Sequence, residues 1–572
     1  MIRRFVSSAA LVLVAATATA QGDTRGQARS QTFIDPLMAS IIGRVTSAET
    51  GAPLRGAEIR ATSERGVSRF ARTDAEGRYV VRDLPSGNFT VHVSKTGFVP
   101  LYFGQRRPFE KRTTIPLKEG ERFSANVVVR RAGAITGRIV DRTGEPVMGA
   151  RVQALRRTMV QGQRGLQTVG VSDVTDDTGA YRVYALPPGD YYLLVVPRPA
   201  VRGRAVREAV PSLATPMFYP GTANRDEAQR ISVEASGEGH ADMQLVDVRA
   251  SSVSGLVITS SGAPAVGAML TLRSRSWEVG GGMAPEAAAM QALQLRDDAG
   301  ADGSFNIEGV PPGTYTLVAQ TRLPTPLLLD PATLRAGNSP LMEIETASMP
   351  VTVDGDVGGV TLTTARGGVL EVEFVRAEGV TRQLPASARF AVRMTDTSEM
   401  GTLSPMGGGR VMLDLTRPAR LDVEELPEEW AVKAILVDNQ DVIDTPIQIK
   451  SGTAKARVVL TDRVTDVTGS VAQAAFADNG PLPAATVIAF ADDDRKWTYP
   501  SRYIKTARTD AAGTFRMRGL PPDETYRFVA VDYLEDGEET DPDFLARLRE
   551  RASRLSLSEG ERKAIDLRLI QR

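Results

Sequence analysis

The same pattern of apolar and polar residues recurs at four places along the chain. At each place an aromatic residue begins a run in which every second side chain is apolar, as in Phe89-Thr-Val-His-Val. A period of two predicts a β-strand that buries one of its faces. Large aromatic side chains anchor cores between sheets. The aromatic residues that we expect to act as such anchors are Phe89, Tyr191, Tyr315 and Tyr526.

A turn and a corner precede each of these strands. The corner is a Leu-Pro or Val-Pro pair that begins at residues 84, 186, 310 and 520, and a glycine lies seven residues before it in every copy. The turn that ends at this glycine reads Thr-Asp-x-x-Gly in three copies. An Asp side chain caps a tight turn, and glycine accepts the positive φ at which the chain reverses. The structural residues predicted from the turn and the corner are Asp74, Gly77, Tyr79, Gly87, Asp176, Gly179, Tyr181, Gly189, Gly303, Gly313, Asp510, Gly513 and Phe515.

Opening and closing segments extend this motif to a full repeat. Short glycine-containing strands open four copies, at Gly43, Gly137, Gly255 and Gly469. An additional closing segment at 447–452 indicates a degenerate copy, in which Trp430 replaces the anchor aromatic and is expected to be buried. Roughly seven short strands in a copy are typical of a β-sandwich. The predicted fold is an all-β tandem array of about five sandwiches, at residues 39–131, 132–249, 250–365, 366–462 and 463–572.

The beginning of the chain has the features of a secretory signal. Two arginines precede an apolar stretch, and small residues at 18–20 form a cleavage site. Residues 1–20 are therefore predicted to be a signal peptide, and 21–38 a polar linker. No later segment is long and apolar enough to span a membrane. We expect a secreted or periplasmic protein without a membrane span.

Composition excludes several kinds of partner and cofactor. The 69 Lys and Arg residues balance the 69 Asp and Glu residues, so no overall charge favours nucleic acid or an anionic membrane. The chain has no cysteine, which excludes disulfides, thiolate metal sites and a lipidated cysteine anchor. It has two histidines, His92 and His240, which lie in different repeats. Because no catalytic motif accompanies them, we predict no enzyme activity, no cofactor and no metal site.

Exposed aromatic residues would be the clearest sign of sugar binding, because the CH faces of sugars stack on aromatic rings. The candidate ligand-binding residues are Trp497, Tyr499 and Tyr503, together with Trp277 beside a glycine-rich loop. Packing against a neighbouring sandwich is the alternative explanation for the first three. The adjacent aspartates at 492–494 also have two interpretations, as solvated turn residues or as a calcium site.

One segment of the last repeat predicts a helix. Residues 541–555 begin with Asp-Pro and have apolar residues on one side, at Phe544, Leu545, Leu548 and Leu555. We expect this helix to pack on the last sandwich, with docking of a partner as the alternative.

The glycine-containing opening, the Thr-Asp-x-x-Gly-x-Tyr turn and the Leu-Pro-Pro-Gly-x-Tyr corner together resemble carboxypeptidase regulatory-like domains. The resemblance is strong for the first, second and last repeats. It implies a transthyretin-like, seven-stranded Greek-key sandwich, grouped with carbohydrate-binding-like folds. It also implies an accessory role, since the enzymes that give this family its name have a separate zinc peptidase domain. Function inferred from fold alone is analogy.

Two functional hypotheses follow from the sequence. The first is a non-catalytic protein that binds extracellular polysaccharide or cell-envelope glycan. The second is a structural or adhesive spacer that docks an envelope protein through its sheet edges, or that serves a separate secreted enzyme. An exposed group of Trp497, Tyr499 and Tyr503 would favour the first hypothesis, whereas bare, uncharged edge strands would favour the second.

Overall fold

The computed structural model describes most of the chain. The described residues are 38–64, 66–160, 162–197, 212–213, 216–223, 227–246, 248–249, 251–274, 295–322, 344–366, 368–394, 404–405, 409–413, 418–424, 426–449, 452–472, 485–510 and 512–572. The predicted signal peptide, the linker up to residue 37 and Trp277 lie outside these ranges. Strands dominate the described part, and we refer to its five predicted segments as repeats 1 to 5.

Repeat 1 is a sandwich of two sheets. β1 pairs with β4, β8 and β9 in one sheet, and the other sheet has the order β3-β2-β5-β6, with β7 also paired to β5. Its strands are β1 (Ala39–Ser47), β2 (Glu58–Ser63), β3 (Ser68–Arg72), β4 (Arg78–Leu84), β5 (Gly87–Ser94), β6 (Leu101–Tyr102), β7 (Ile115–Leu117), β8 (Arg122–Ser124) and β9 (Val127–Val129).

Repeat 2 repeats this plan, with one long hairpin. Its strand β12 pairs with β11 in one sheet and with β13 in the other, which joins the two sheets at one side. Its strands are β10 (Gly133–Val140), β11 (Arg151–Val160), β12 (Gln163–Val174), β13 (Ala180–Leu186), β14 (Gly189–Val196), β15 (Ser212–Leu213), β16 (Met217–Phe218), β17 (Ile231–Val233), β18 (Glu238–His240), β19 (Met243–Gln244) and β20 (Val248–Arg249).

Repeats 3 and 4 each have a five-stranded and a three-stranded sheet among the described residues. Repeat 3 contains β21 (Ser251–Ile258), β22 (Met269–Ser274), β23 (Arg296–Asp298), β24 (Ser304–Val310), β25 (Gly313–Arg322), β26 (Ile344–Val353), β27 (Val357–Thr363) and β28 (Ala365–Arg366). Repeat 4 contains β29 (Gly368–Arg376), β30 (Arg389–Met394), β31 (Ser404–Pro405), β32 (Gly409–Leu413), β33 (Ala419–Glu424), β34 (Ala431–Val437), β35 (Gln440–Asp441) and β36 (Thr453–Thr461).

In repeat 5 the two sheets are joined through β44, which pairs with both β41 and β37. The strands are β37 (Asp466–Ala472), β38 (Thr486–Ala491), β39 (Ile504–Arg508), β40 (Thr514–Arg518), β41 (Glu524–Val531), β42 (Ser553–Leu557), β43 (Arg562–Ala564) and β44 (Leu567–Ile570). The short helices are η3 (Asp494–Trp497), η4 (Glu538–Thr540) and α3 (Pro542–Arg549).

The predicted helix is present but shorter than expected. Asp541 caps α3 by accepting a hydrogen bond from Asp543 N, and its apolar side packs on the sheet of repeat 5. The helix ends at Arg549, and the prediction that it continues to Leu555 is wrong. Residues Ser553–Leu557 form β42 instead, with Leu555 opposite Tyr526 on β41. In this segment polar and apolar residues alternate, and the strand that they form pairs with β41. This pairing outweighs the helical spacing of Leu555.

The repeated turn has the geometry that its residues require. Asp74 accepts hydrogen bonds from Glu76 N and Arg78 N, and Asp176 and Asp510 cap their turns in the same way. All four turn glycines, Gly77, Gly179, Gly303 and Gly513, have φ between 73° and 79°. The corner glycines Gly87, Gly189 and Gly313 also have positive φ. These residues are structural, as the sequence predicted.

The opening glycines allow two backbone segments to approach closely. Gly137 lies opposite Tyr181, and a Cβ on Gly137 would lie 2.0 Å from the carbonyl oxygen of Ala241. The Tyr181 hydroxyl donates a 2.6 Å hydrogen bond to that same carbonyl. Repeat 1 has the same arrangement, in which Tyr79 donates to Ala125 O beside Gly43. In repeat 5, Phe515 packs over Gly469 without a hydroxyl.

Each repeat encloses its own apolar core. The buried members of five clusters fall within residues 39–129, 135–243, 253–362, 370–460 and 467–569. The anchor aromatics Phe89, Tyr191, Tyr315 and Tyr526 are all buried. Trp430 is buried in the core of repeat 4, which confirms its predicted role as the substitute anchor. The chain is therefore a multi-domain β-sandwich protein.

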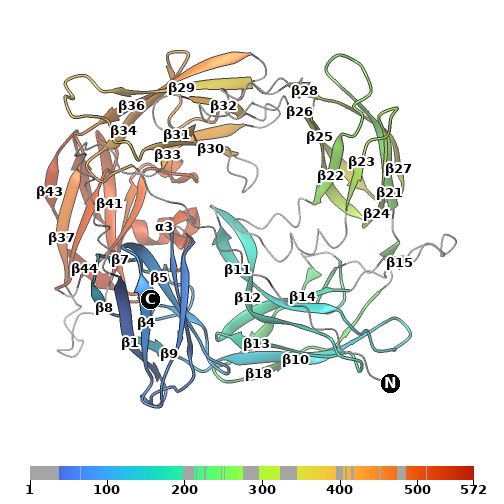
Figure 1. Ribbon diagram of the computed structural model, residues 1–572, viewed down its shortest axis with the longest axis horizontal. Coiled ribbons are helices and arrows are strands. Elements are labelled where there is room, and N and C mark those ends of the chain that lie inside the picture. Colours follow the sequence, from blue (N-terminus) through green and yellow to red (C-terminus); the bar gives the residue numbers. More distant parts are fainter. Residues whose placement is uncertain are drawn as a thin grey trace, which may run out of the picture.

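The repeats follow one another around a closed ring, so that repeat 5 (red) lies beside repeat 1 (blue) (Figure 1). Repeat 5 contacts repeat 1 through Arg508, which donates to Gly104 O and Glu110 Oε2. It contacts repeat 2 through Glu535, whose two carboxylate oxygens each accept a 2.7 Å hydrogen bond from Arg156. Phe109 lies under the Arg156 guanidinium, 4.3 Å from it. Repeat 5, at one end of the array, therefore contacts repeats 1 and 2 at the other end.

Candidate functional site

Trp497 is buried inside repeat 5. Its side chain is 3% exposed, and its indole N–H donates a 2.8 Å hydrogen bond to Ala491 O. Its ring makes an edge contact with Phe490, and the same apolar cluster includes Phe544 and Leu548 of α3. Because no face of the indole is open to solvent, Trp497 does not contribute to an exposed platform for sugar.

Tyr503 holds repeats 4 and 5 together. It is buried, and its hydroxyl donates a 2.7 Å hydrogen bond to Asp444 Oδ2 in repeat 4. Arg502 binds the same carboxylate, and Lys496 and Arg502 both lie over the Tyr503 ring. Burial and the Asp444 carboxylate together raise the pKa of Tyr503 to about 12. The alternative interpretation, that these aromatics pack against a neighbouring sandwich, therefore describes Tyr503.

Tyr499 lies at the contact between repeats 5 and 2. A Cβ on Gly162, in the hairpin of repeat 2, would lie 2.1 Å from the Cβ of Tyr499, so glycine is needed for this contact. The Tyr499 side chain is partly exposed. Trp277, the fourth candidate, lies outside the described residues. Of the four candidate ligand-binding residues, Trp497 and Tyr503 are therefore buried, and the prediction that they bind a ligand is wrong for these two.

A crevice lies between repeats 4 and 5, with a volume of about 920 Å³. Ligand sites in proteins have volumes of about 300–1,000 Å³. Apolar residues such as Leu426, Pro427 and Leu520 form part of its wall. Its cationic lining residues are Arg420, Lys433, Arg463, Arg502, Lys505, Arg516 and Arg518, and its carboxylates are Asp422, Glu428, Asp444, Asp523 and Glu559.

The cations of the crevice outnumber the carboxylates that they contact. Asp444 is shared by Arg420 and Arg502, at 3.8 and 2.9 Å. Glu559 is shared by Lys433 and Arg463, at 2.9 and 3.8 Å. Asp466 is shared by Arg516 and Arg518. In each of these three contacts, two cations share one carboxylate, while Asp422 also acts on Arg420 and Glu428 on Arg516.

The charged groups of Lys505 and Arg518 are partly buried and contact neighbouring atoms of the crevice. The Lys505 ammonium donates a 2.7 Å hydrogen bond to Arg518 O, and burial lowers the pKa of this lysine. Arg518 Nε is buried, lies 3.6 Å from Asp466 Oδ2 and makes no hydrogen bond in the described structure. A buried donor without an acceptor costs free energy, about 1–3 kcal/mol. Its nearest charged partner is the Asp466 carboxylate.

Two sheet edges also line the crevice. β40 is the last strand of its sheet and pairs with β37 alone among the described strands. Gly519 N donates to Thr465 O and Gly513 O accepts from Val471 N, so odd-numbered residues of β40 face β37. By alternation, the backbone groups of Arg516 and Arg518 point away from β37.

The second edge belongs to β33, which pairs with β30. Ala419 exchanges two hydrogen bonds with Ile447 on the outer side of β33. By the same alternation, the backbone groups of Leu421 and Val423 also point outward. The N–H of Val423 is bonded to Asp422 Oδ1. Both Leu421 and Val423 line the crevice.

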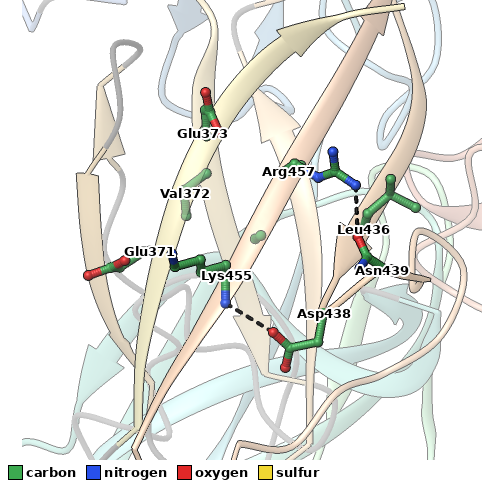
Figure 2. Close-up of a pocket in the computed structure, with 9 residues that line it drawn as sticks. Glu371, Val372, Glu373, Leu436, Asp438, Asn439, Lys455 and Arg457 are labelled. Carbon is green, nitrogen blue, oxygen red and sulfur yellow. Dashed lines mark hydrogen bonds between the residues drawn. The ribbon is translucent and has the colours of Figure 1, made fainter.

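A smaller pocket of about 550 Å³ lies on the five-stranded sheet of repeat 4. Figure 2 shows Glu371 and Glu373 on β29, and Lys455 and Arg457 on β36, with Asp438 and Asn439 at the end of β34. Arg457 donates a 2.8 Å hydrogen bond to Asn439 Oδ1. Its three carboxylates and two cations are mostly exposed, which is typical of a solvated sheet face.

Of the aspartates at 492–494, Asp492 and Asp493 bind arginines. Arg527, Arg549 and Arg554 all contact the Asp492 carboxylate. Asp493 caps η3 and pairs with Arg495, which holds the Asp493 pKa at about 2. Three arginines around Asp492 oppose a cation there. Among the described residues, no group of three or more His, Asp or Glu side chains could hold a metal ion.

The crevice could not be found from one stretch of sequence. Its walls come from residues between 420 and 559 on two repeats. The usable sequence signal is the alternation of arginines on β40, at Arg516 and Arg518, beside the turn motif. That pattern predicts a charged outer face, but it does not show which repeat lies opposite.

Comparison with protein families identifies the first two repeats. Residues 40–130 and 134–208 match the family model of the carboxypeptidase regulatory-like domain. The two matches lie in repeats 1 and 2, whose turn and corner motifs resemble this domain. No curated protein matches the chain.

Among solved structures, 143 chains match. The Bacillus anthracis TIE protein matches at 13% identity and a TM-score of 0.14, over 71% of this chain and 69% of that chain. A streptococcal ancillary pilin matches at 14% identity and a TM-score of 0.20, over 57% and 99%. The Bacillus cereus major pilin subunit BcpA matches at 10% identity and a TM-score of 0.13, over 57% and 99%. Likeness at this level carries no argument about function.

Within the described residues, no helix has the length and apolar character needed to cross a membrane.

Proposed function

We propose that this protein is a non-catalytic docking protein of the extracytoplasmic space, which holds a partner protein at the crevice between repeats 4 and 5. The observation that carries this proposal is the pair of sheet edges, β33 and β40, that line one crevice. Sheet edges bind extended polypeptide through backbone hydrogen bonds. A crevice with two such edges is suited to a protein partner.

The burial of the aromatic residues supports a protein partner over a sugar. Trp497 and Tyr503 contribute to the interior of repeat 5 and to its contact with repeat 4. Binding of polysaccharide or envelope glycan would need exposed rings beside polar donors. Carbohydrate binding is therefore the competing outcome of the experiment below.

The non-catalytic role rests on the nature of the repeated motif. Its recurring residues cap turns, fill cores and allow close backbone contacts. The ring arrangement also supports docking. Hydrogen bonds to repeats 1, 2 and 4 hold repeat 5, which forms one wall of the crevice. The signal sequence at residues 1–20 supports an extracytoplasmic location.

The test uses the mature chain, residues 21–572, immobilised on a surface. Envelope proteins and a panel of soluble polysaccharides are passed over it separately, and saturable retention is measured. The proposal expects a retained species that protease destroys and that soluble polysaccharide does not displace. Retention of a polysaccharide, without any protease-sensitive species, would contradict it.

A further inference from the structure

We infer that the partner of the crevice is an extended acidic polypeptide segment, which adds as a strand to the edge of β40 and whose carboxylates bind Arg516, Arg518 and Lys505. This inference rests on the proposed docking function and specifies the chemistry of the partner. It has two independent supports, the backbone geometry of the edge and the charge of the crevice.

The backbone of β40 presents the groups that an added strand needs. The N–H and C=O of Arg516 point away from β37, as does the N–H of Arg518. The Arg518 carbonyl accepts from the Lys505 ammonium, which can turn to a carboxylate when a strand arrives. Along the edge of a strand, every second residue directs its backbone N–H and C=O toward an added strand. An extended segment therefore fits this edge in register.

The side chains of β40 match a partner strand whose side chains also alternate between two faces. Phe515 and Met517 are buried, while Arg516 and Arg518 lie on the opposite face of the strand. A partner strand with acidic residues at every second position would place its carboxylates next to these arginines. The Arg518 N–H that makes no hydrogen bond would gain an acceptor. Arginine binds carboxylates well because its planar fork can donate two hydrogen bonds.

The charge of the whole crevice also favours an acidic occupant. Its seven cations lie among six carboxylates, which are the five that line the crevice and Asp466, which pairs with Arg516 and Arg518. Complementary charge speeds association and selects partners. Glu428 and Asp523 at the rim oppose this attraction in part, so the excess is modest. We therefore expect binding that weakens as the salt concentration rises.

The test uses a defined probe, a blocked ten-residue peptide in which Glu and Thr alternate, with a Gln-Thr peptide of the same length as the control. Affinity for the mature chain is measured by fluorescence anisotropy. The Glu peptide is expected to bind at least about tenfold more tightly than the Gln peptide. Amides of β40 are expected to exchange more slowly with deuterium when the peptide is bound, because strand addition protects them.

Three variants make the test specific to the crevice. Arg516→Gln/Arg518→Gln and, separately, Lys505→Gln are expected to weaken binding of the Glu peptide at least about fivefold. Lys505→Gln is included because Arg516 pairs with the buried Asp466, so the double variant removes a structural contact. Arg182→Gln is the matched control: Arg182 on repeat 2 is 58% exposed, as Arg516 is, and also pairs with a carboxylate. It is expected to bind like the unaltered chain.

The outcomes separate this inference from the proposed function. Equal binding of the Glu and Gln peptides, no binding of either, or binding that Lys505→Gln leaves unchanged would overturn the acidic-segment inference. So would tight binding of polygalacturonate that the same variants abolish when the Glu peptide does not bind. If a protein partner binds the Arg516→Gln/Arg518→Gln chain as tightly as the unaltered chain, the inference fails and the docking function stands. If no protein binds the unaltered chain, the docking function itself fails.

Discussion

At the scale of single residues, part of the repeated motif is explained by contacts between residues that are far apart in the sequence. The turn residues were predictable, because Asp and Gly act on their own neighbours in the chain. The role of the opening glycine was not predictable from its own segment. Gly137 lies against Ala241 O, about a hundred residues later in the chain, and shares that carbonyl with Tyr181.

This contact predicts a large effect of one added methyl group. Gly137→Ala would place its Cβ 2.0 Å from Ala241 O, so backbone must move. We expect the free energy of unfolding of repeat 2 to fall by about 1–3 kcal/mol or more. Chemical denaturation measures it. Gly355→Ala is the control, since a Cβ there meets nothing within 4 Å; equal stability of the two variants would contradict this explanation.

Asp444 makes the contact between repeats 4 and 5 sensitive to acid. Burial alone would raise the pKa of Asp444, but hydrogen bonds from Arg502 and Tyr503 hold it below its usual value of 3.8. A carboxylate with a lowered pKa stabilises the folded chain above the pKa of its unfolded form. That stability is lost as pH falls through the lowered pKa.

Asp444→Asn should therefore destabilise the chain at neutral pH and have a smaller effect at low pH. Unfolding of both chains by denaturant, measured from pH 7 to pH 2.5, gives the difference in stability at each pH. The difference is expected to shrink below about pH 4. A difference that stays constant over this range would show that the Asp444 carboxylate is not the source of the stability.

At the scale of elements, strands were predictable and the loop at 492–503 was not. The alternation of apolar residues identified the strand after each corner, because it reflects one buried face. The helix at 541–555 was predicted too long, because Leu555 fits both a helical and a strand pattern. The loop was ambiguous because an aromatic cluster beside charges has the same composition whether it binds sugar or packs between repeats.

Trp497→Ala is expected to act on stability. Removing a buried indole leaves a cavity under α3, at a cost of about 3–5 kcal/mol. Thermal unfolding measures the loss. Arg495→Ala, in the same short helix and 86% exposed on its side chain, should change stability by less than about 0.5 kcal/mol. A stable Trp497→Ala chain would mean that the indole is not part of this core.

The ion pair between Arg156 and Glu535 predicts how repeat 2 is held against repeat 5. Their side chains are 24% and 21% exposed, and each carboxylate oxygen accepts from the guanidinium. Arg156→Met would leave Glu535 partly buried without its cation, at a cost of about 1–3 kcal/mol. Arg157→Met, at the exposed next residue, is the control. Small-angle scattering should show a larger radius for Arg156→Met alone; unchanged scattering and stability would contradict the assigned role.

At the scale of the whole molecule, the repeats were predictable and their arrangement was not. Each repeat buries its own core, so motifs within one repeat suffice to identify it. Contacts between repeats use few residues, and in several of them a loop such as 104–113 or 532–537 meets a strand residue such as Arg508 or Arg156. Loops vary in sequence without changing the sandwich, so no periodic signal marks them. The crevice follows from this arrangement, because it lies where repeat 5 packs against repeat 4.

The closure of the ring through repeats 1 and 5 can be tested by a single cross-link. Glu110 and Glu535 are paired directly across an isolated antiparallel bridge, and the chain has no natural cysteine. Opposed residues in such a pair are close enough for a disulfide. The Glu110→Cys/Glu535→Cys chain, oxidised at low concentration, should form one intramolecular disulfide, detected as a linked peptide pair by mass spectrometry. Free thiols, or cross-links only between molecules, would contradict the closed arrangement.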